Sequence, residues 1–188
     1  MKSFLLLALI ALASCLSGGW TKHSLAEDNI YIEGAFIESF KAYANDENVD
    51  PDNFVRLSVY SQVVNGNNYR VCFIDRNESL TIQEFIIYVP LQTSNKNEPI
   101  FKVFSKKAIK SSSLSLNNGE AYDFVEKYTH KGLDKIGDKM YKISNVYHSE
   151  NINNIFYIVF TEYEKDKHEY VIVRDKATHE FDHFDKIK

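Results

Sequence analysis

The chain has 188 residues, of which 44% are hydrophobic and 14% aromatic, so it can form a packed core and is too apolar to be disordered throughout. The formal net charge is −4, and lysine and arginine are scattered without forming a basic stripe. We therefore do not expect a nucleic acid as the main partner.

The N-terminal residues predict a secretory signal peptide. One lysine precedes the apolar run FLLLALIALA at 4–13, and small residues follow it. Cleavage after Ser17 leaves Gly18-Gly19 at the new N-terminus, and cleavage after Cys15 also fits the small-residue rule. We expect a protein that is secreted, or that enters the lumen of the secretory or endolysosomal pathway, without a membrane anchor in its mature form. The alternative is a bacterial lipoprotein anchored at a lipidated Cys15.

The first half predicts a helix followed by strands. Apolar residues at helical spacing predict a helix over 30–45, and alternation predicts a hairpin within 54–74. Asn65-Gly66 is a strong signal for a two-residue turn in that hairpin, because both residues tolerate positive φ. Two further strands are expected at 81–89 and 100–104.

The second half predicts the same order of elements. A polar stretch at 110–120 is interpreted as a linker or a loose leading strand. A helix over 120–136 follows, then a hairpin at 141–164, then strands at 168–175 and 179–184.

Short segments of the two halves also correspond in sequence. NGNNYRVCFI at 65–74 and NINNIFYIVF at 151–160 share the pattern N-x-N-N, and VYSQ at 59–62 is similar to VYHS at 146–149. We interpret the chain as two diverged copies of one α-plus-four-strand unit, each an antiparallel sheet wrapped around one helix in an α+β fold. The expected segments are the signal peptide and the two units, at 1–17, 18–109 and 110–188.

The turn of the first hairpin carries an unusual pair of side chains. Val63 and Val64 stand beside the turn, where polar residues are the rule, and exposed apolar groups commonly mark an interaction site. The corresponding residues of the second copy, HSENI at 148–152, have no glycine and are expected to form a polar tip.

The residues around this turn resemble the cystatins, a family of inhibitors of papain-like cysteine proteases. QVVNG at 62–66 fits the family's Q-x-V-x-G, and GGW at 18–20 is similar to the glycine-bearing N-terminal trunk. Pro90 lies where the second hairpin of the family begins. The chain looks closest to the disulfide-free stefins and plant cystatins, although Leu91 stands where many members have tryptophan.

The resemblance implies two cystatin-like units, the second degenerate, in a protein that is not an enzyme and uses no cofactor or metal. The first unit is expected to block a papain-like protease reversibly, with the trunk and two hairpins entering the active-site groove. The implied protease-contacting residues are Gly18, Gly19, Gln62, Val63, Val64, Asn65, Gly66, Pro90 and Leu91.

Three other positions invite a functional interpretation. Cys72 lies in an apolar strand-like run and is expected to be a buried, inert thiol, without a disulfide once Cys15 has been removed or lipidated. Asn77 begins the one glycosylation sequon, in an expected exposed turn. Trp20 either anchors the trunk to a protease or packs on the helix.

The sequence leaves two alternative functions to consider. HEFDH at 179–183 matches the zinc motif H-E-x-x-H, which requires both histidines on one helix face. A strand is predicted there instead, and it would place the histidines about 13 Å apart. The other alternative is a secreted cystatin-fold binding or scaffold protein that inhibits nothing, in which Val63 and Val64 pack against the second copy. The second unit either binds a different partner or supports the first.

Overall fold

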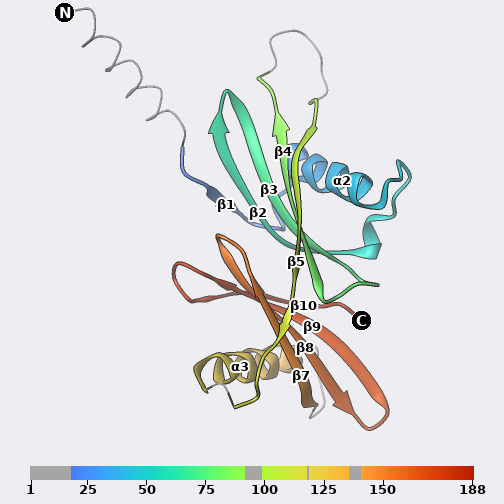
Figure 1. The fold of residues 1–188 in the computed structure, drawn as a ribbon, viewed down its shortest axis with the longest axis vertical. Coiled ribbons are helices and arrows are strands. Elements are labelled where there is room, and N and C mark those ends of the chain that lie inside the picture. The colour runs from blue at the N-terminus through green and yellow to red at the C-terminus, as the bar shows by residue number, and fades with distance from the viewer. Residues whose placement is uncertain (1–17, 92–98, 118, 136–140) are drawn as a thin grey trace, which may run out of the picture. The chain divides into compact units, whose positions relative to one another are not determined.

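The structure is a computed structural model that describes residues 18–91, 99–117, 119–135 and 141–188. In these residues it contains two five-stranded antiparallel sheets and two α-helices (Figure 1), so the predicted α+β class is confirmed. No helix among them is long and apolar enough to cross a membrane. The expected signal peptide at 1–17, including Cys15, lies outside the described residues.

The chain divides into two compact units. Most residues up to Lys107 belong to the first unit, and Ala108–Lys188 belong to the second. Two short segments of the first half, Asp52–Val55 and Ile74–Gln83, are grouped with the second unit.

The first sheet is a meander whose strands follow one another in space in the order β1-β2-β3-β4-β5. One α-helix, α2, stands between the first two strands of the chain, and a short 3-10 helix, η1, leads into the second. The elements of the first half are β1 (Thr21–His23), α2 (Ile30–Ala44), η1 (Pro51–Asn53), β2 (Phe54–Val64), β3 (Gly66–Asp75), β4 (Thr81–Val89) and β5 (Lys102–Lys110).

Helix α2 is capped by an asparagine at each end. The side-chain oxygen of Asn29 accepts hydrogen bonds from the backbone N–H groups of Tyr31 and Ile32, which have no partner within the helix. Asn45 ends the helix in the left-handed conformation, with φ of 55°. The expected helix over 30–45 is therefore confirmed to within one residue.

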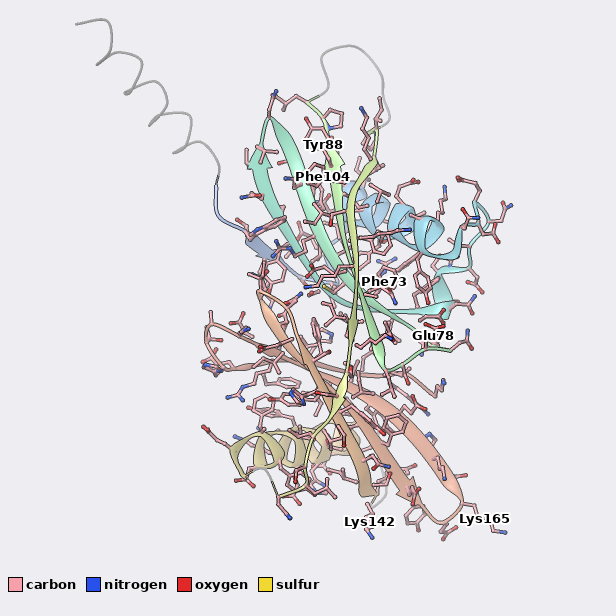
Figure 2. The ribbon with its side chains drawn as sticks, in the orientation of Figure 1. Phe73, Glu78, Tyr88, Phe104, Lys142 and Lys165 are labelled. Atoms are coloured by element: carbon pink, nitrogen blue, oxygen red, sulfur yellow. The ribbon has the colours of Figure 1, made fainter. Side chains whose placement is uncertain are left out.

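Aromatic rings join α2 to one face of the first sheet. Phe36 and Phe40 are fully buried, and the Phe40 ring lies edge-on to the Phe73 ring of β3, with centroids 4.9 Å apart. Phe73, which is labelled in Figure 2, in turn stacks on Phe85 of β4 with ring centroids 5.7 Å apart. These contacts form the core that supports the first hairpin.

The second sheet has the strand order β10-β9-β8-β7-β6. Its core contains buried residues of the strands together with Val125 of α3, and Phe124 and Tyr128 pack against it. The elements are β6 (Ser112–Ser113), α3 (Gly119–Lys135), β7 (Lys142–Glu150), β8 (Asn154–Tyr163), β9 (Asp166–Asp175) and β10 (Phe181–Lys186).

The edge strands of the two sheets pair in an equivalent register. In the first sheet Thr21 of β1 is opposite Ser61 of β2. In the second, Ser112 of β6 is opposite His148 of β7, and the match of VYSQ with VYHS makes His148 the counterpart of Ser61. The leading strand suggested for 110–120 is thus present as β6.

Two strands depart from the expectation. β1 was not anticipated, because Thr21–His23 has no apolar alternation. The strand expected at 100–104 instead spans Lys102–Lys110, and all but Ile109 of its residues are exposed. An exposed edge strand lacks the alternating burial from which strands are recognised.

Candidate functional site

The tip of the β2–β3 hairpin is tighter than expected. β2 ends at Val64 and β3 begins at Gly66, so that Asn65 alone lies between the strands, rather than the predicted Asn65-Gly66 pair. The side chain of Val63 is 58% exposed, as predicted, but Val64 is only partly exposed. Val63 is therefore the main apolar side chain that this tip offers to a partner, while Gln62 is half-buried and Asn65 exposed.

Gly66 is required at this tip for two physical reasons. Its φ of +121° lies in a region that residues with a side chain rarely adopt. A Cβ atom at this position would also lie 2.5 Å from the carbonyl oxygen of Val89 and 3.1 Å from the Cα of Pro90. The glycine thus allows the end of β4 to lie directly against the hairpin.

The end of β4 completes one side of the tip. The hydroxyl of Tyr88 donates a hydrogen bond to the carbonyl oxygen of Asn65, and Pro90 and Leu91 follow (Figure 2). Leu91 is 61% exposed, so two large apolar side chains, Val63 and Leu91, face solvent at this end of the sheet. The structure brings the QVVNG tip and Pro90-Leu91 together at one end of the sheet.

The N-terminal segment approaches the same end from the other side. The antiparallel pairing of Thr21 with Ser61 and of His23 with Val59, continued by two residues, would place Gly19 opposite Val63. Gly18 and Gly19 are exposed, and a Cβ atom added to either would meet nothing within 4 Å. The candidate site therefore consists of 18–19, 62–66 and 90–91.

This site acts through shape and apolar surface. None of its side chains is titratable, and the pKa shifts of the first unit arise outside the site. The pKa of Glu33 is lowered mainly by its hydrogen bond with Arg56, and the pKa of Tyr69 is raised mainly by burial. Such an arrangement can bind a groove but offers no acid, base or nucleophile.

The other sequence candidates are not part of this site. Cys72 is a free thiol and is fully buried, as expected for its place in an apolar strand. Asn77 is exposed in the turn between β3 and β4, as expected. In HEFDH, His179 stands in a turn with φ of 59° and His183 lies in β10, so the two histidines do not share a helix face. The described residues contain no cluster of three or more side chains able to hold a metal.

The corresponding tip of the second sheet is not purely polar, which corrects the expectation. Ile152 lies in the β7–β8 turn with 70% of its side chain exposed. Charged groups flank it, since Lys176 Nζ lies 3.0 Å from a carboxylate oxygen of Glu150. The backbone N–H of Lys176 also donates to the carbonyl oxygen of Asn153 at 2.8 Å.

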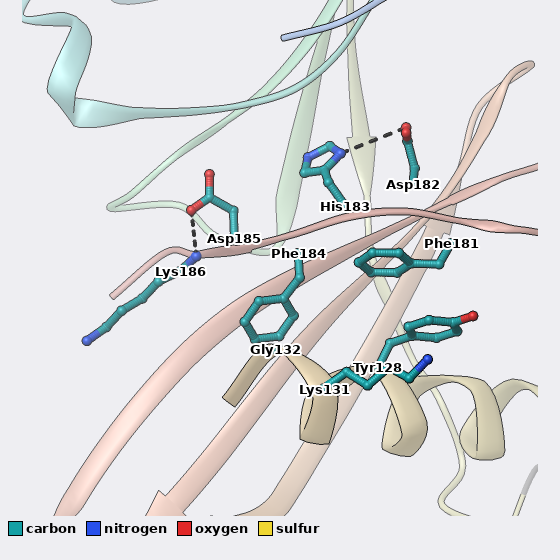
Figure 3. A pocket seen from close by; sticks show the side chains of 9 residues that line it. All are labelled: Tyr128, Lys131, Gly132, Phe181, Asp182, His183, Phe184, Asp185 and Lys186. Atoms are coloured by element: carbon teal, nitrogen blue, oxygen red, sulfur yellow. Dashed lines mark hydrogen bonds and ion pairs between the residues drawn. The ribbon is translucent and has the colours of Figure 1, made fainter. Parts of the chain in front are cut away.

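A cavity of about 650 Å³ opens between α3 and β10 of the second unit (Figure 3). Phe181 and Phe184 point toward α3, while Asp182 and His183 point to the opposite side of the strand. A β-bulge between Phe181 and His183 explains why the two phenylalanines, three residues apart, share one face. The Phe181 ring stacks on Tyr128 at 4.4 Å, so these rings serve the packing of α3 on the sheet.

No protein-family model, curated protein or solved structure matches this chain. The functional interpretation therefore depends on the site itself. Sequence reasoning missed Tyr88 and the partner of Trp20, which is Arg70 of β3. Both contacts join residues more than 20 positions apart, and no local pattern signals them.

Proposed function

We propose that this protein is a reversible inhibitor of papain-like cysteine proteases, the function that its resemblance to the cystatins implies. The three segments of the candidate site would enter the active-site groove of the protease and block it without presenting a bond for cleavage. We also propose that both units are cystatin-like and that the second is degenerate. Residues 1–17 would direct the chain into the secretory pathway and be removed.

One observation supports this proposal most. The β2–β3 tip and the end of β4 meet at one end of the first sheet, where Val63 and Leu91 are exposed. The β1–β2 pairing, continued by two residues, would bring Gly18-Gly19 to the same end. Apolar groups at the end of a hairpin add nothing to a core, so their exposure is best explained by a partner.

The energetics of such a wedge are favourable. Burying a valine or leucine side chain on binding contributes about 1.5–3 kcal/mol, with less for Val64, which is already partly covered. The tip is preorganised by the Tyr88 hydrogen bond and by the contact of Gly66 with the end of β4. Little conformational entropy is therefore lost when it docks.

The test is a titration of the chain that begins at Gly18 against a papain-like protease of known active-site concentration. We expect stoichiometric inhibition, and we expect the double variant Val63→Asp, Val64→Asp to weaken it by at least about 100-fold, because carboxylates would have to enter an apolar groove. Ile152→Asp is the matched control, since it places a carboxylate on the other exposed tip and should leave inhibition unchanged.

Other results would reject the proposal. If the wild-type chain fails to inhibit several papain-like proteases at micromolar concentration, the non-inhibitory scaffold is the better interpretation. If Ile152→Asp abolishes inhibition while the valine variant retains it, the inhibitory site lies on the second unit.

A further inference from the structure

Trp20 packs on the first sheet through a well-defined contact with Arg70. The guanidinium carbon of Arg70 lies 4.0 Å from the centroid of the indole ring, and Arg70 itself is only 5% exposed. A guanidinium group stacked on tryptophan in a partly desolvated place is a favourable cation–π pair. Trp20 is half-buried there.

This contact is on the face of the sheet opposite to α2. Phe73 of β3 packs on α2 through Phe40, and side chains alternate between the two faces of a strand. Arg70 precedes Phe73 by three residues and therefore points to the other face. Of the two roles considered for Trp20, packing on the helix does not apply.

Trp20 is the last anchored residue before the exposed glycines. β1 pairs with β2 over three residues only, and His23 Nε2 lies 2.7 Å from the hydroxyl oxygen of Ser61 at its far end. On the N-terminal side of Trp20, Gly18 and Gly19 have open space around their Cα atoms. Glycine loses more backbone conformational entropy on ordering than any other residue. The direction of Gly18 and Gly19 therefore depends on Trp20, the residue that precedes β1.

We propose that the stack of Trp20 on Arg70 is the positioning contact of the N-terminal trunk, a role that rests on the proposed inhibitory function. It holds the start of β1 in register, so that Gly18-Gly19 run beside Val63 instead of sampling all directions. The trunk is then ordered before a protease arrives. Preorganisation of this kind strengthens binding by lowering the entropy lost on docking.

Replacing either partner should weaken inhibition without abolishing it. We expect Trp20→Ala to increase the dissociation rate of the protease complex about tenfold, and Trp20→Phe to retain part of the effect. Arg70→Lys keeps the charge but loses the planar group that stacks on the ring, so its effect should lie between these two. Leu116→Ala, which removes an exposed apolar side chain from the second unit, is the matched control and should have no effect.

A double-mutant cycle separates positioning from direct contact with the protease. If Trp20 acts through Arg70, the variant Trp20→Ala, Arg70→Lys should dissociate no faster than Trp20→Ala alone. Additive effects of the two substitutions would overturn the proposal, because the residues would then act independently. Thermal denaturation of each variant checks that Arg70→Lys has not unfolded the sheet.

Fluorescence tests the stack without any protease. Trp20 is the only tryptophan of the chain, so its emission reports on this one contact. We expect limited quenching by acrylamide in the wild type, and emission shifted to longer wavelength with stronger quenching in Arg70→Lys. Wild-type quenching as strong as that of free indole would overturn the stack.

The two readouts distinguish failure of this inference from failure of the proposed function. A shielded Trp20 together with inhibition that Trp20→Ala leaves unchanged would reject the positioning role while the inhibitory function stands. A wild-type chain that does not inhibit at all would reject the inhibitory function, and the positioning role with it.

Discussion

The two hairpin tips differ more than the sheets that carry them. Both sheets have a short edge strand in an equivalent register, and in both the chain after the fourth strand contacts the turn of the hairpin. The first tip exposes Val63 beside Leu91, whereas the second exposes Ile152 beside the ion pair of Glu150 and Lys176. The scaffold sets the position of each tip, but the side chains of the tip determine which partner surface can bind it. The charged pair at the second tip would lose water without gaining new partners, and this opposes binding in an apolar groove.

The segments that lead into the two edge strands also differ. Gly18 and Gly19 precede β1 and are exposed. At the corresponding place before β6 stands Lys110, the last residue of β5, with Ser111 alone between the two strands. The second sheet therefore has no free segment to serve as a trunk, and this is a second reason to assign inhibition to the first unit.

The largest expected effect is a loss of unfolding free energy when a buried side chain is removed from the core of either unit. Phe40→Ala removes a fully buried ring that supports β3 and should cost about 3–5 kcal/mol of unfolding free energy. Ile172→Ala in the second core should cost about 2–5 kcal/mol. Urea denaturation measures both costs, and protease titration in low urea should show inhibition lost first in Phe40→Ala. Equal loss in both variants would contradict the assignment of the site to the first unit.

Gly66→Ala should have the next largest effect. The new Cβ atom would meet the Val89 carbonyl at a φ that alanine rarely adopts, at a cost of about 2–4 kcal/mol. The tip would separate from Pro90, so inhibition should fall about 100-fold as well. Gly19→Ala is the control for stability, because its Cβ atom would occupy open space. A Gly66→Ala variant with wild-type urea midpoint and inhibition would show that the close approach is unimportant.

Tyr88→Phe tests the hydrogen bond that joins β4 to the first tip. The carbonyl oxygen of Asn65 is exposed and can bind water instead, so the loss should be about 1 kcal/mol or less. We expect a dissociation rate from the protease that rises by less than tenfold, with an unchanged association rate. Lys176→Met removes the ion pair with Glu150 at the second tip. It should change neither the association rate nor the dissociation rate of the protease complex.

Prediction from sequence succeeded where burial is periodic and failed where it is not. Helix α2 and strands β2 to β4 were found because their apolar residues recur at 3.6 or 2 positions and face a core. β1 and most of β5 are exposed and show no such period. At the site, the exposure of Val63 was predicted, but the partial cover of Val64 was not. Contacts such as Tyr88 with Asn65 depend on how distant strands meet, which no local pattern contains.

The smallest expected effect is a dependence of folding stability on pH. It tests the scaffold of the first unit independently of the tip. The two terminal guanidinium nitrogens of Arg56, Nη1 and Nη2, donate to the carboxylate of Glu33, at 2.6 and 2.7 Å. This bond lowers the pKa of Glu33 in the folded state. The resulting stability is present above the unfolded pKa of about 4.3 and is lost as the pH falls through the lower folded pKa.

Because about half of the Glu33 side chain is exposed, solvent screening limits the contribution to a few tenths of a kcal/mol. Thermal denaturation of the wild type and Glu33→Gln should therefore show a small difference at pH 7 that shrinks as the pH falls below the unfolded pKa of about 4.3. Arg56→Gln, measured in parallel, should give the same dependence on pH, because it removes the other partner of the same bond. The inhibition constant of Glu33→Gln should equal that of the wild type at pH 7, since no residue of the tip contributes to this pair. A change in inhibition without a change in stability would mean that α2 itself contacts the protease, and the contact surface would then extend beyond 18–19, 62–66 and 90–91.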